Sequence, residues 1–126
     1  MSGKSDKITI EARFWLRKGD DRYLAEGKIE LMKAIKETGS ISAASRKMGI
    51  SYKKAWKLVD RLNSFSDKEA VTTEKGGKGG GGAKLSPYGE YLLALYKESR
   101  KRFSKVLDDL NKEIQKKVKD EGKYKS

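Results

Sequence analysis

Two short helical patterns that meet at Gly49 constrain this chain more than any other feature of its sequence. Apolar and small residues share one side of each pattern: Ile41, Ala44, Ser45 and Met48 in the first, and Ala55, Leu58, Val59 and Leu62 in the second. Gly49 predicts the left-handed backbone that ends the first helix, and Ser51 predicts the N-cap of the next. The pattern is typical of a helix-turn-helix, and two packed helices of a small bundle are the alternative.

The outward side of the second pattern is cationic. The side chains opposite its apolar side are Lys53, Lys57, Asp60 and Arg61, with Tyr52 and Trp56 on the flank. A cationic helix entered by its N-terminus suits the major groove of DNA, where Ser, Tyr and Lys side chains reach base edges and phosphates. A solvated lysine face is the alternative.

The whole chain carries the same sign of charge. Thirty Lys and Arg against eighteen Asp and Glu give a formal net charge of +12, and no His is present to change it near neutral pH. Such an excess favours a polyanionic partner, nucleic acid first and an anionic membrane surface second. A lysine-rich surface that serves solubility alone is the alternative.

Neither Cys nor His occurs in the sequence. Their absence excludes disulfides, thiolate metal sites, Cys or His nucleophiles and the usual zinc ligands. We therefore expect no catalytic residue, no metal, no cofactor and no enzymatic activity. No apolar run is long enough to span a bilayer or to form a signal peptide, so we expect a cytoplasmic, nucleoid-associated protein without a membrane partner.

The N-terminal part predicts a β-hairpin. After a flexible start over residues 1–7, apolar side chains alternate with polar ones, which predicts a strand over 8–17 with one buried face. The side chains on that face are Ile8, Ile10, Ala12, Phe14 and Leu16. A turn at 18–21 and a returning strand at 22–25 complete the hairpin. Helices are expected next, over 27–37, 40–48 and from 51 to 63 or 65.

A glycine-rich run at 76–82 separates two β-prone segments, 70–75 and 83–86. A phosphate-binding loop needs another spacing ahead of its Gly-Lys-Ser/Thr, and a flexible linker joins complete domains. The flanking strands instead favour a hairpin tip, which beside a helix-turn-helix is a wing. Such a glycine backbone approaches a phosphate ridge or a minor groove, while Lys75, Lys78 and Lys84 neutralise charge.

From Pro87 onward, residues 87–120 predict one helix about 45 Å long with an apolar stripe. A core this small does not cover that length. The far half is therefore expected to pack on the same stripe of a second subunit, and fraying past Leu110 is the alternative. The side chains expected at this dimer interface are Phe14, Leu92, Leu95, Tyr96, Phe103, Val106 and Leu110.

A family resemblance is carried by three segments: Thr38-Gly-Ser-Ile-Ser-Ala-Ala44, Met48-Gly-Ile-Ser-Tyr-Lys-Lys-Ala-Trp56 and Gly76-Gly-Lys-Gly-Gly-Gly-Gly-Ala-Lys-Leu-Ser-Pro-Tyr-Gly89. Together they resemble the N-terminal winged helix-turn-helix domain of the molybdate-responsive ModE regulators, which is related to the LysR-type DNA-binding domain. The resemblance covers roughly residues 10–100, with the segments in the same order and at the same separations. It implies a dimer formed through the N-terminal hairpin, the first helix and the long C-terminal helix.

The resemblance also assigns roles along the chain. Contacts to double-stranded DNA are expected from Ser51, Tyr52, Lys53, Lys54, Trp56, Lys57 and Arg61 in the recognition helix, Ser40 and Ser42 in the first motif helix, and Thr73, Lys75, Gly77, Lys78, Gly79 and Lys84 in the wing. Packing against the core is an equal alternative for Trp56. Members that sense molybdate carry a downstream oxyanion-binding domain, and no residues remain for it here, so no oxyanion effector domain is expected in this chain.

The expected fold class is mainly α with small β-hairpins: a winged helix-turn-helix with an N-terminal hairpin and a long C-terminal helix. The expected division is a flexible N-terminus at 1–7, a DNA-binding domain at 8–86, a dimerisation helix at 87–120 and a basic tail at 121–126. The expected function is sequence-specific binding of double-stranded DNA by a homodimeric transcriptional regulator. An abundant architectural protein that coats DNA with little sequence preference, and an interaction adaptor that uses the long helix, are the alternatives.

Overall fold

A computed structural model of the chain describes residues 7–64, 67–75 and 81–119. The chain divides into two compact units, one of Phe14–Lys97 and one of Met1–Arg13 with Glu98–Ser126. The elements are β1 (Leu16–Lys18), β2 (Asp21–Leu24), α1 (Glu26–Thr38), α2 (Ile41–Met48), α3 (Tyr52–Ser64), β3 (Val71–Thr73), β4 (Ala83–Leu85) and α4 (Pro87–Val118). This order confirms the expected mainly α fold with two small antiparallel hairpins and a long C-terminal helix.

Glycines end the first two helices. Gly39 and Gly49 have φ angles of 76° and 70°, and their amides donate to carbonyls of the helices that they close. The hydroxyl oxygen of Ser40 accepts from the Ala43 amide at 2.9 Å, and that of Ser51 accepts from the Lys54 amide at 3.0 Å. The predictions for Gly49 and Ser51 are confirmed, and both turns follow from local chemistry.

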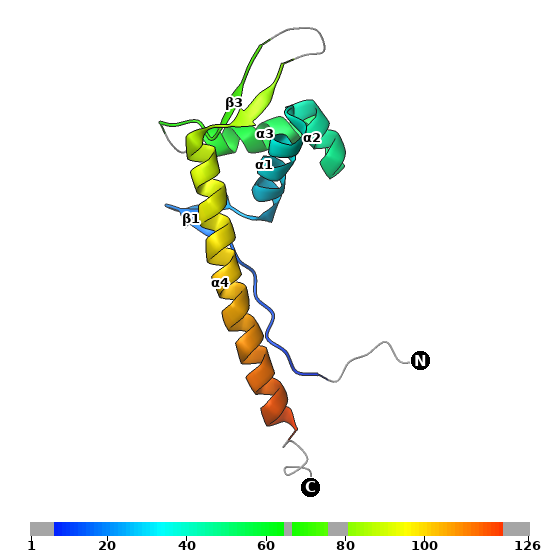
Figure 1. Cartoon of the computed structure of the whole chain (residues 1–126), viewed down its shortest axis with the longest axis vertical. Helices are drawn as coiled ribbons and strands as arrows, with labels where there is room; N and C mark the ends of the chain where they lie inside the picture. Colours follow the sequence, from blue (N-terminus) through cyan, green and yellow to red (C-terminus); the bar gives the residue numbers. More distant parts are fainter. Residues whose placement is uncertain (1–6, 65–66, 76–80, 120–126) are drawn as a thin grey trace, which may run out of the picture. The chain divides into compact units, whose positions relative to one another are not determined.

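The hydrophobic core lies in the Phe14–Lys97 unit. Figure 1 shows α1, α2 and α3 gathered together with the β3–β4 hairpin extending from them. The largest fully buried side chains are Leu24, Ile29, Leu31, Met32, Ile35, Val59, Leu62 and Val71. Each contributes about 1.5–3 kcal/mol by leaving water. The first turns of α4 add Leu92, Leu93 and Tyr96, so this unit contains a core of its own.

The expected strand over 8–17 is wrong for most of its length. Residues 7–15 have no regular secondary structure, and Ile8 and Ile10 are 52% and 37% exposed. The antiparallel register pairs Leu16 with Leu24, so a longer ladder would pair Phe14 with Glu26, where α1 already begins. A strand needs a neighbour. The alternating pattern therefore ends in a short hairpin whose turn contains Gly19 at a φ of 60°.

The other unit contains the segment 7–13 and the α4 residues from Glu98 onward. The Asn111 side chain accepts from the Ile10 amide at 2.6 Å and donates to the Ile10 carbonyl at 3.2 Å. The Gln115 amide donates to the Ile8 carbonyl at 2.6 Å. No residue described in this unit is buried. The helix nevertheless continues past Leu110 to Val118, close to the expected end.

Candidate nucleic-acid interface

The outer side of α3 is the cationic surface that its sequence predicts. Ala55, Val59 and Leu62 are buried and fix the side of the helix that faces the core. The side chains of Ser51, Tyr52, Lys53, Lys54, Lys57 and Arg61 are exposed, whereas Trp56 is half-buried. Trp56 packs against the core and also contacts Tyr52 edge to face, with ring centroids 6.2 Å apart. Both roles weighed for Trp56 are therefore compatible with its position.

The hairpin beside α3 is joined to the helices by backbone hydrogen bonds. Val71, Thr72 and Thr73 pair with Leu85, Lys84 and Ala83, respectively. The Ala83 amide donates to the Gly39 carbonyl at 2.8 Å, which attaches β4 to the turn between α1 and α2. The side chains of Thr73, Lys75 and Lys84 are exposed, while Gly77, Lys78 and Gly79 lie outside the described residues.

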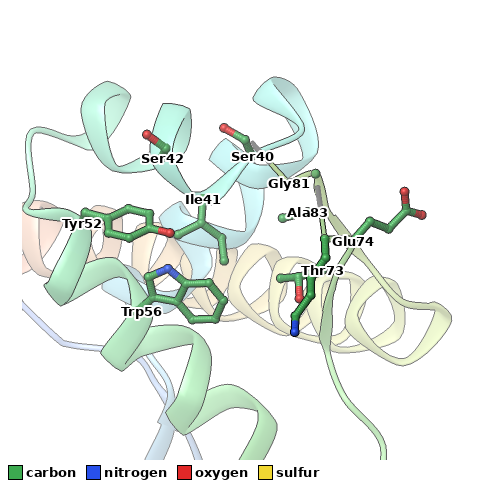
Figure 2. A pocket seen from close by; sticks show the side chains of 11 residues that line it. Ser40, Ile41, Ser42, Tyr52, Trp56, Thr73, Glu74, Gly81 and Ala83 are labelled. Carbon is green, nitrogen blue, oxygen red and sulfur yellow. The ribbon is translucent and has the colours of Figure 1, made fainter. Parts of the chain in front are cut away.

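A cavity of about 580 Å³ lies between the start of α2, the first turns of α3 and the base of this hairpin. Its lining comprises Ser40, Ile41, Ser42, Tyr52, Trp56, Thr73, Glu74, Lys75, Gly81, Gly82 and Ala83. Figure 2 shows how side chains from all three elements surround this space. The structure thus brings together residues from the three groups expected to contact DNA.

The two serines of α2 have local partners. Ser40 caps the helix, as described above. The Ser42 hydroxyl oxygen accepts from the Arg46 guanidinium at 2.8 Å. In each case the hydroxyl oxygen acts as an acceptor, so the O–H group can still donate to a ligand.

Asn63 is a supporting residue that the sequence analysis did not single out. Its side-chain oxygen accepts from the amides of Ala70 and Val71 at 2.8 and 3.1 Å, and its amide donates to the Val71 carbonyl at 3.0 Å. These bonds fasten the start of β3 to the end of α3. The only signal in the sequence is a polar residue next to buried Leu62, which is too common to be informative.

The N-terminal hairpin supports α3 from its C-terminal end. The Tyr23 hydroxyl donates to the Leu62 carbonyl at 3.0 Å, and the Arg61 guanidinium lies 3.1 Å from the Asp21 carboxylate. Burial raises the pKa of the Tyr23 phenol well above its ordinary value, and Tyr88 raises it further. Arg61, expected to bind DNA, thus already has an ionic partner in this unit.

Lys28 lies beneath the same hairpin. Its ammonium donates to the Tyr23 and Arg22 carbonyls at 2.7 and 3.3 Å. Burial lowers the pKa of Lys28, and the Asp21 carboxylate acts in the opposite direction. The lysine thus satisfies strand carbonyls at the end of β2.

The residues expected at a dimer interface differ in how much of each side chain is exposed: some are buried, some are half-buried and some lie at the surface. Leu92 and Tyr96 are buried in the core, and half-buried Phe14 contacts the Tyr96 ring edge to face with centroids 5.5 Å apart. Phe103 is half-buried. The side chains that remain at the surface are Leu95, Val106 and Leu110, at 42%, 56% and 42% exposure.

Two features are absent from the part of the chain that the structure describes: a cluster of metal-ligating side chains and a helix that could cross a membrane. Within residues 7–64, 67–75 and 81–119, no group of three or more Asp, Glu, His or Cys side chains is placed to hold a metal ion. No helix in these ranges is long and apolar enough to cross a membrane.

No protein-family model matches the chain. The chain is 44% identical over 87 residues to the molybdenum-pterin-binding protein MopB of Rhodobacter capsulatus, covering 69% of this chain and 32% of that protein. It is 49% identical over 69 residues to the transcriptional regulator ModE of Yersinia pestis, covering 55% and 26%.

A third relative is the DNA-binding transcriptional dual regulator ModE of Escherichia coli strain K12. Identity is 42% over 86 residues, covering 65% of this chain and 33% of that protein. The chain therefore spans about a third or less of the length of these curated relatives. Across the matched segment, which makes up more than half of its own length in each case, this chain is similar to these ModE and MopB proteins.

Proposed function

We propose that this chain binds double-stranded DNA in a sequence-specific manner, as a homodimeric transcriptional regulator of the winged helix-turn-helix type. The observation that carries the proposal is the exposed cationic side of α3 next to the β3–β4 hairpin. In this arrangement α3 enters the major groove and the hairpin approaches the backbone or the minor groove. The names of two relatives, both transcriptional regulators, support the same function.

The division of labour follows the chemistry of the exposed side chains. Lys53, Lys54 and Lys57 on α3 attract phosphates, and Lys75 and Lys84 do the same from the hairpin. Ser51 lies directly before α3, at the end of the helix that reaches base edges in helix-turn-helix proteins. The mechanism is binding without catalysis, so it requires no cofactor.

The homodimer is supported by the unit in which residues 7–13 and 98–119, the part that the structure describes, include no buried residue. An amphipathic helix without a packed face is marginal in water. In this unit Ile8, Ile10, Val106 and Leu110 all remain substantially exposed. A second copy would cover these side chains on both protomers at once, as a two-fold interface does. Two recognition helices would then read half-sites in successive major grooves.

Selection of genomic fragments by the purified protein tests this function. The selection is run at about 0.15 M salt, where the sequence-independent electrostatic attraction is already weakened, and bound fragments are sequenced. We expect enrichment of a two-fold symmetric motif. Even coverage of the genome would instead support the architectural alternative, which the net charge of +12 favours, and absence of any duplex binding at low salt would refute both.

A matched pair of variants sharpens this test. Ser51→Ala at the tip of α3 is expected to change which fragments are enriched. Lys84→Gln in the hairpin is expected to weaken binding to all sequences and to reduce the salt dependence by one phosphate contact, about one unit in the slope of log K against log salt. If the protein is a site-specific regulator, the α3 variant changes sequence preference, whereas the hairpin variant weakens binding to all sequences alike.

A further inference from the structure

The cavity between α2, α3 and the hairpin has polar groups turned into it that make no hydrogen bond within the described part of the chain. Figure 2 shows the Tyr52 hydroxyl and the Trp56 indole nitrogen turned toward the space below Ile41. No hydrogen bond joins either atom to another described residue, although the two rings are in edge-to-face contact. Indole N–H is a donor only, and a phenol O–H readily donates. Two donors that face the same space are therefore available to a ligand.

The rest of the lining restricts that ligand. Two charged residues, Glu74 and Lys75, also line the cavity, and Figure 2 shows the Glu74 carboxylate turned away from Tyr52 and Trp56. Ser40 and Ser42 can donate their hydroxyl protons, because their oxygens already accept. Ile41 and Ala83 are buried and form apolar wall, together with the Trp56 ring. A ligand for this site therefore combines oxygen acceptors with a compact apolar body.

The shape of the cavity points to one component of duplex DNA. A concave site accommodates a convex ridge, and on a duplex the ridge between major and minor grooves is the sugar–phosphate backbone. A phosphodiester has acceptor oxygens and no donor, whereas base edges present both donors and acceptors. The deoxyribose beside it supplies the apolar body.

Gly81, at the rim of the cavity, has no room for a side chain because the other strand of the hairpin lies close to it. A Cβ atom on Gly81 would lie 2.1 Å from the Glu74 carbonyl oxygen. No side chain fits there without a shift of the hairpin. The glycine therefore keeps this rim of the cavity as bare backbone.

We propose that this cavity seats one phosphodiester and its adjoining deoxyribose from one strand of bound DNA, with the Tyr52 hydroxyl and the Trp56 indole N–H donating to the phosphate oxygens. This inference rests on the proposed DNA-binding function and assigns Tyr52 and Trp56 to the backbone. The seat positions α3 in the adjacent groove through these two neutral donors, while Lys75 lines the same cavity. It therefore contributes affinity for every DNA sequence and does not itself read bases.

Because the Tyr52 and Trp56 donors are neutral, their loss should affect the salt dependence of binding differently from the loss of a lysine. Lysine contacts release counterions, so their loss reduces the salt dependence of binding, whereas loss of a neutral hydrogen bond does not. We expect Tyr52→Phe and Trp56→Phe each to weaken binding about tenfold, the magnitude for a hydrogen bond to a charged group. The slope of log K against log salt should stay unchanged. Lys53→Ala, on the same helix, is the matched control and should lower the slope by about one.

The experiment combines these variants with modified DNA. Single methylphosphonate groups, which remove the phosphate charge, are placed in turn along a duplex recovered by the genomic selection. Wild-type protein should show one position in each half-site where the modification weakens binding about tenfold and where it weakens binding of Tyr52→Phe and Trp56→Phe much less, as in a double-mutant cycle. Tyr52→Phe removes only the hydroxyl of a residue that is 53% exposed, so its result stands even if Trp56→Phe destabilises the fold.

The alternative outcomes are separable. If both variants bind as wild type, or if their losses couple to a 7-deazapurine substitution, which removes a base-edge acceptor, and not to any phosphate, the backbone seat is overturned while DNA binding stands. If wild-type protein binds no duplex even at low salt, the seat fails together with the function on which it rests.

Discussion

The two compact units treat their apolar side chains differently. The Phe14–Lys97 unit buries Leu31, Met32 and Leu62 completely, whereas no described residue of the other unit is buried and Leu110 remains 42% exposed. Both units contain helix with an apolar stripe. The difference shows that an apolar stripe indicates which face of a helix packs against another surface. Whether that surface lies within the same chain depends on the elements around the helix.

The comparison also separates two uses of side-chain amides. In the first unit, Asn63 bonds the backbone of buried Ala70 and Val71. In the second, Asn111 makes two bonds to the backbone of exposed Ile10. Water competes for the second set of bonds and is excluded from much of the first, so the same chemistry stabilises the two units unequally.

The largest expected difference is in core truncation. Leu31→Ala should lower the free energy of unfolding by about 2–5 kcal/mol, because it leaves a cavity at a fully buried site. Leu110→Ala is the matched control and should change the unfolding free energy of dilute, monomeric protein by about 0.5 kcal/mol or less. Chemical denaturation of both variants checks this. Equal losses would show that the second unit is packed within the monomer.

Association is expected to respond in the opposite way. Val106→Lys combined with Leu110→Lys should weaken dimerisation by at least about 100-fold, because each protomer loses two apolar side chains from the proposed interface. Leu31→Ala, measured at a protein concentration at which the variant is folded, should dimerise with the same affinity as wild type. Sedimentation equilibrium measures both, and a double variant that remains dimeric would place the interface elsewhere.

The two asparagines give the next largest contrast. Asn63→Ala should lower the free energy of unfolding by about 1–3 kcal/mol, since it leaves backbone groups at buried residues without partners. Asn111→Ala should cost about 0.5 kcal/mol or less by the same measurement. Hydrogen exchange adds a local readout: the Val71 amide should lose protection in the first variant and the Ile10 amide in the second.

A smaller effect is expected at the hairpin that supports α3. Tyr23→Phe leaves the Leu62 carbonyl without its donor and should cost about 1–2 kcal/mol near neutral pH. Because burial raises the pKa of Tyr23, the unfolded chain ionises first as pH rises through about 10, so this residue's stabilisation is complete below that pH and is lost above it. The Tyr23→Phe variant has no ionisable group at this position, so its stability does not show this loss at high pH.

Unfolding of both proteins between pH 7 and 11 measures that difference. The lowered pKa of Lys28 favours folding as pH rises, but it is present in both proteins and cancels in the comparison. A difference in stability between wild type and Tyr23→Phe that stays constant up to pH 11 would contradict the assigned environment of the phenol.

The sequence alone determined the elements whose causes are local. Periodicity and capping predicted α2, the Gly49 turn and the start of α3, because a helix and its cap depend on residues within a few positions of each other. The glycine run between β-prone segments predicted the β3–β4 hairpin for the same reason. The side chains assigned to DNA on α3 follow from this periodicity and the ModE resemblance, and they remain predictions.

Only the tertiary structure decided which chain segments meet. The alternation over 8–17 is as regular as a buried strand requires, yet the start of α1 at Glu26 removes the partner on which a longer ladder depends. Asn63, Tyr23 and Asn111 carry no periodic signal, since their bonds join residues 7, 39 and 101 positions apart. The cavity beside Trp56 also arises only when α2, α3 and the hairpin pack together. Local patterns specify which side of an element is apolar, but contacts between distant segments depend on the simultaneous packing of all elements, which no local pattern encodes.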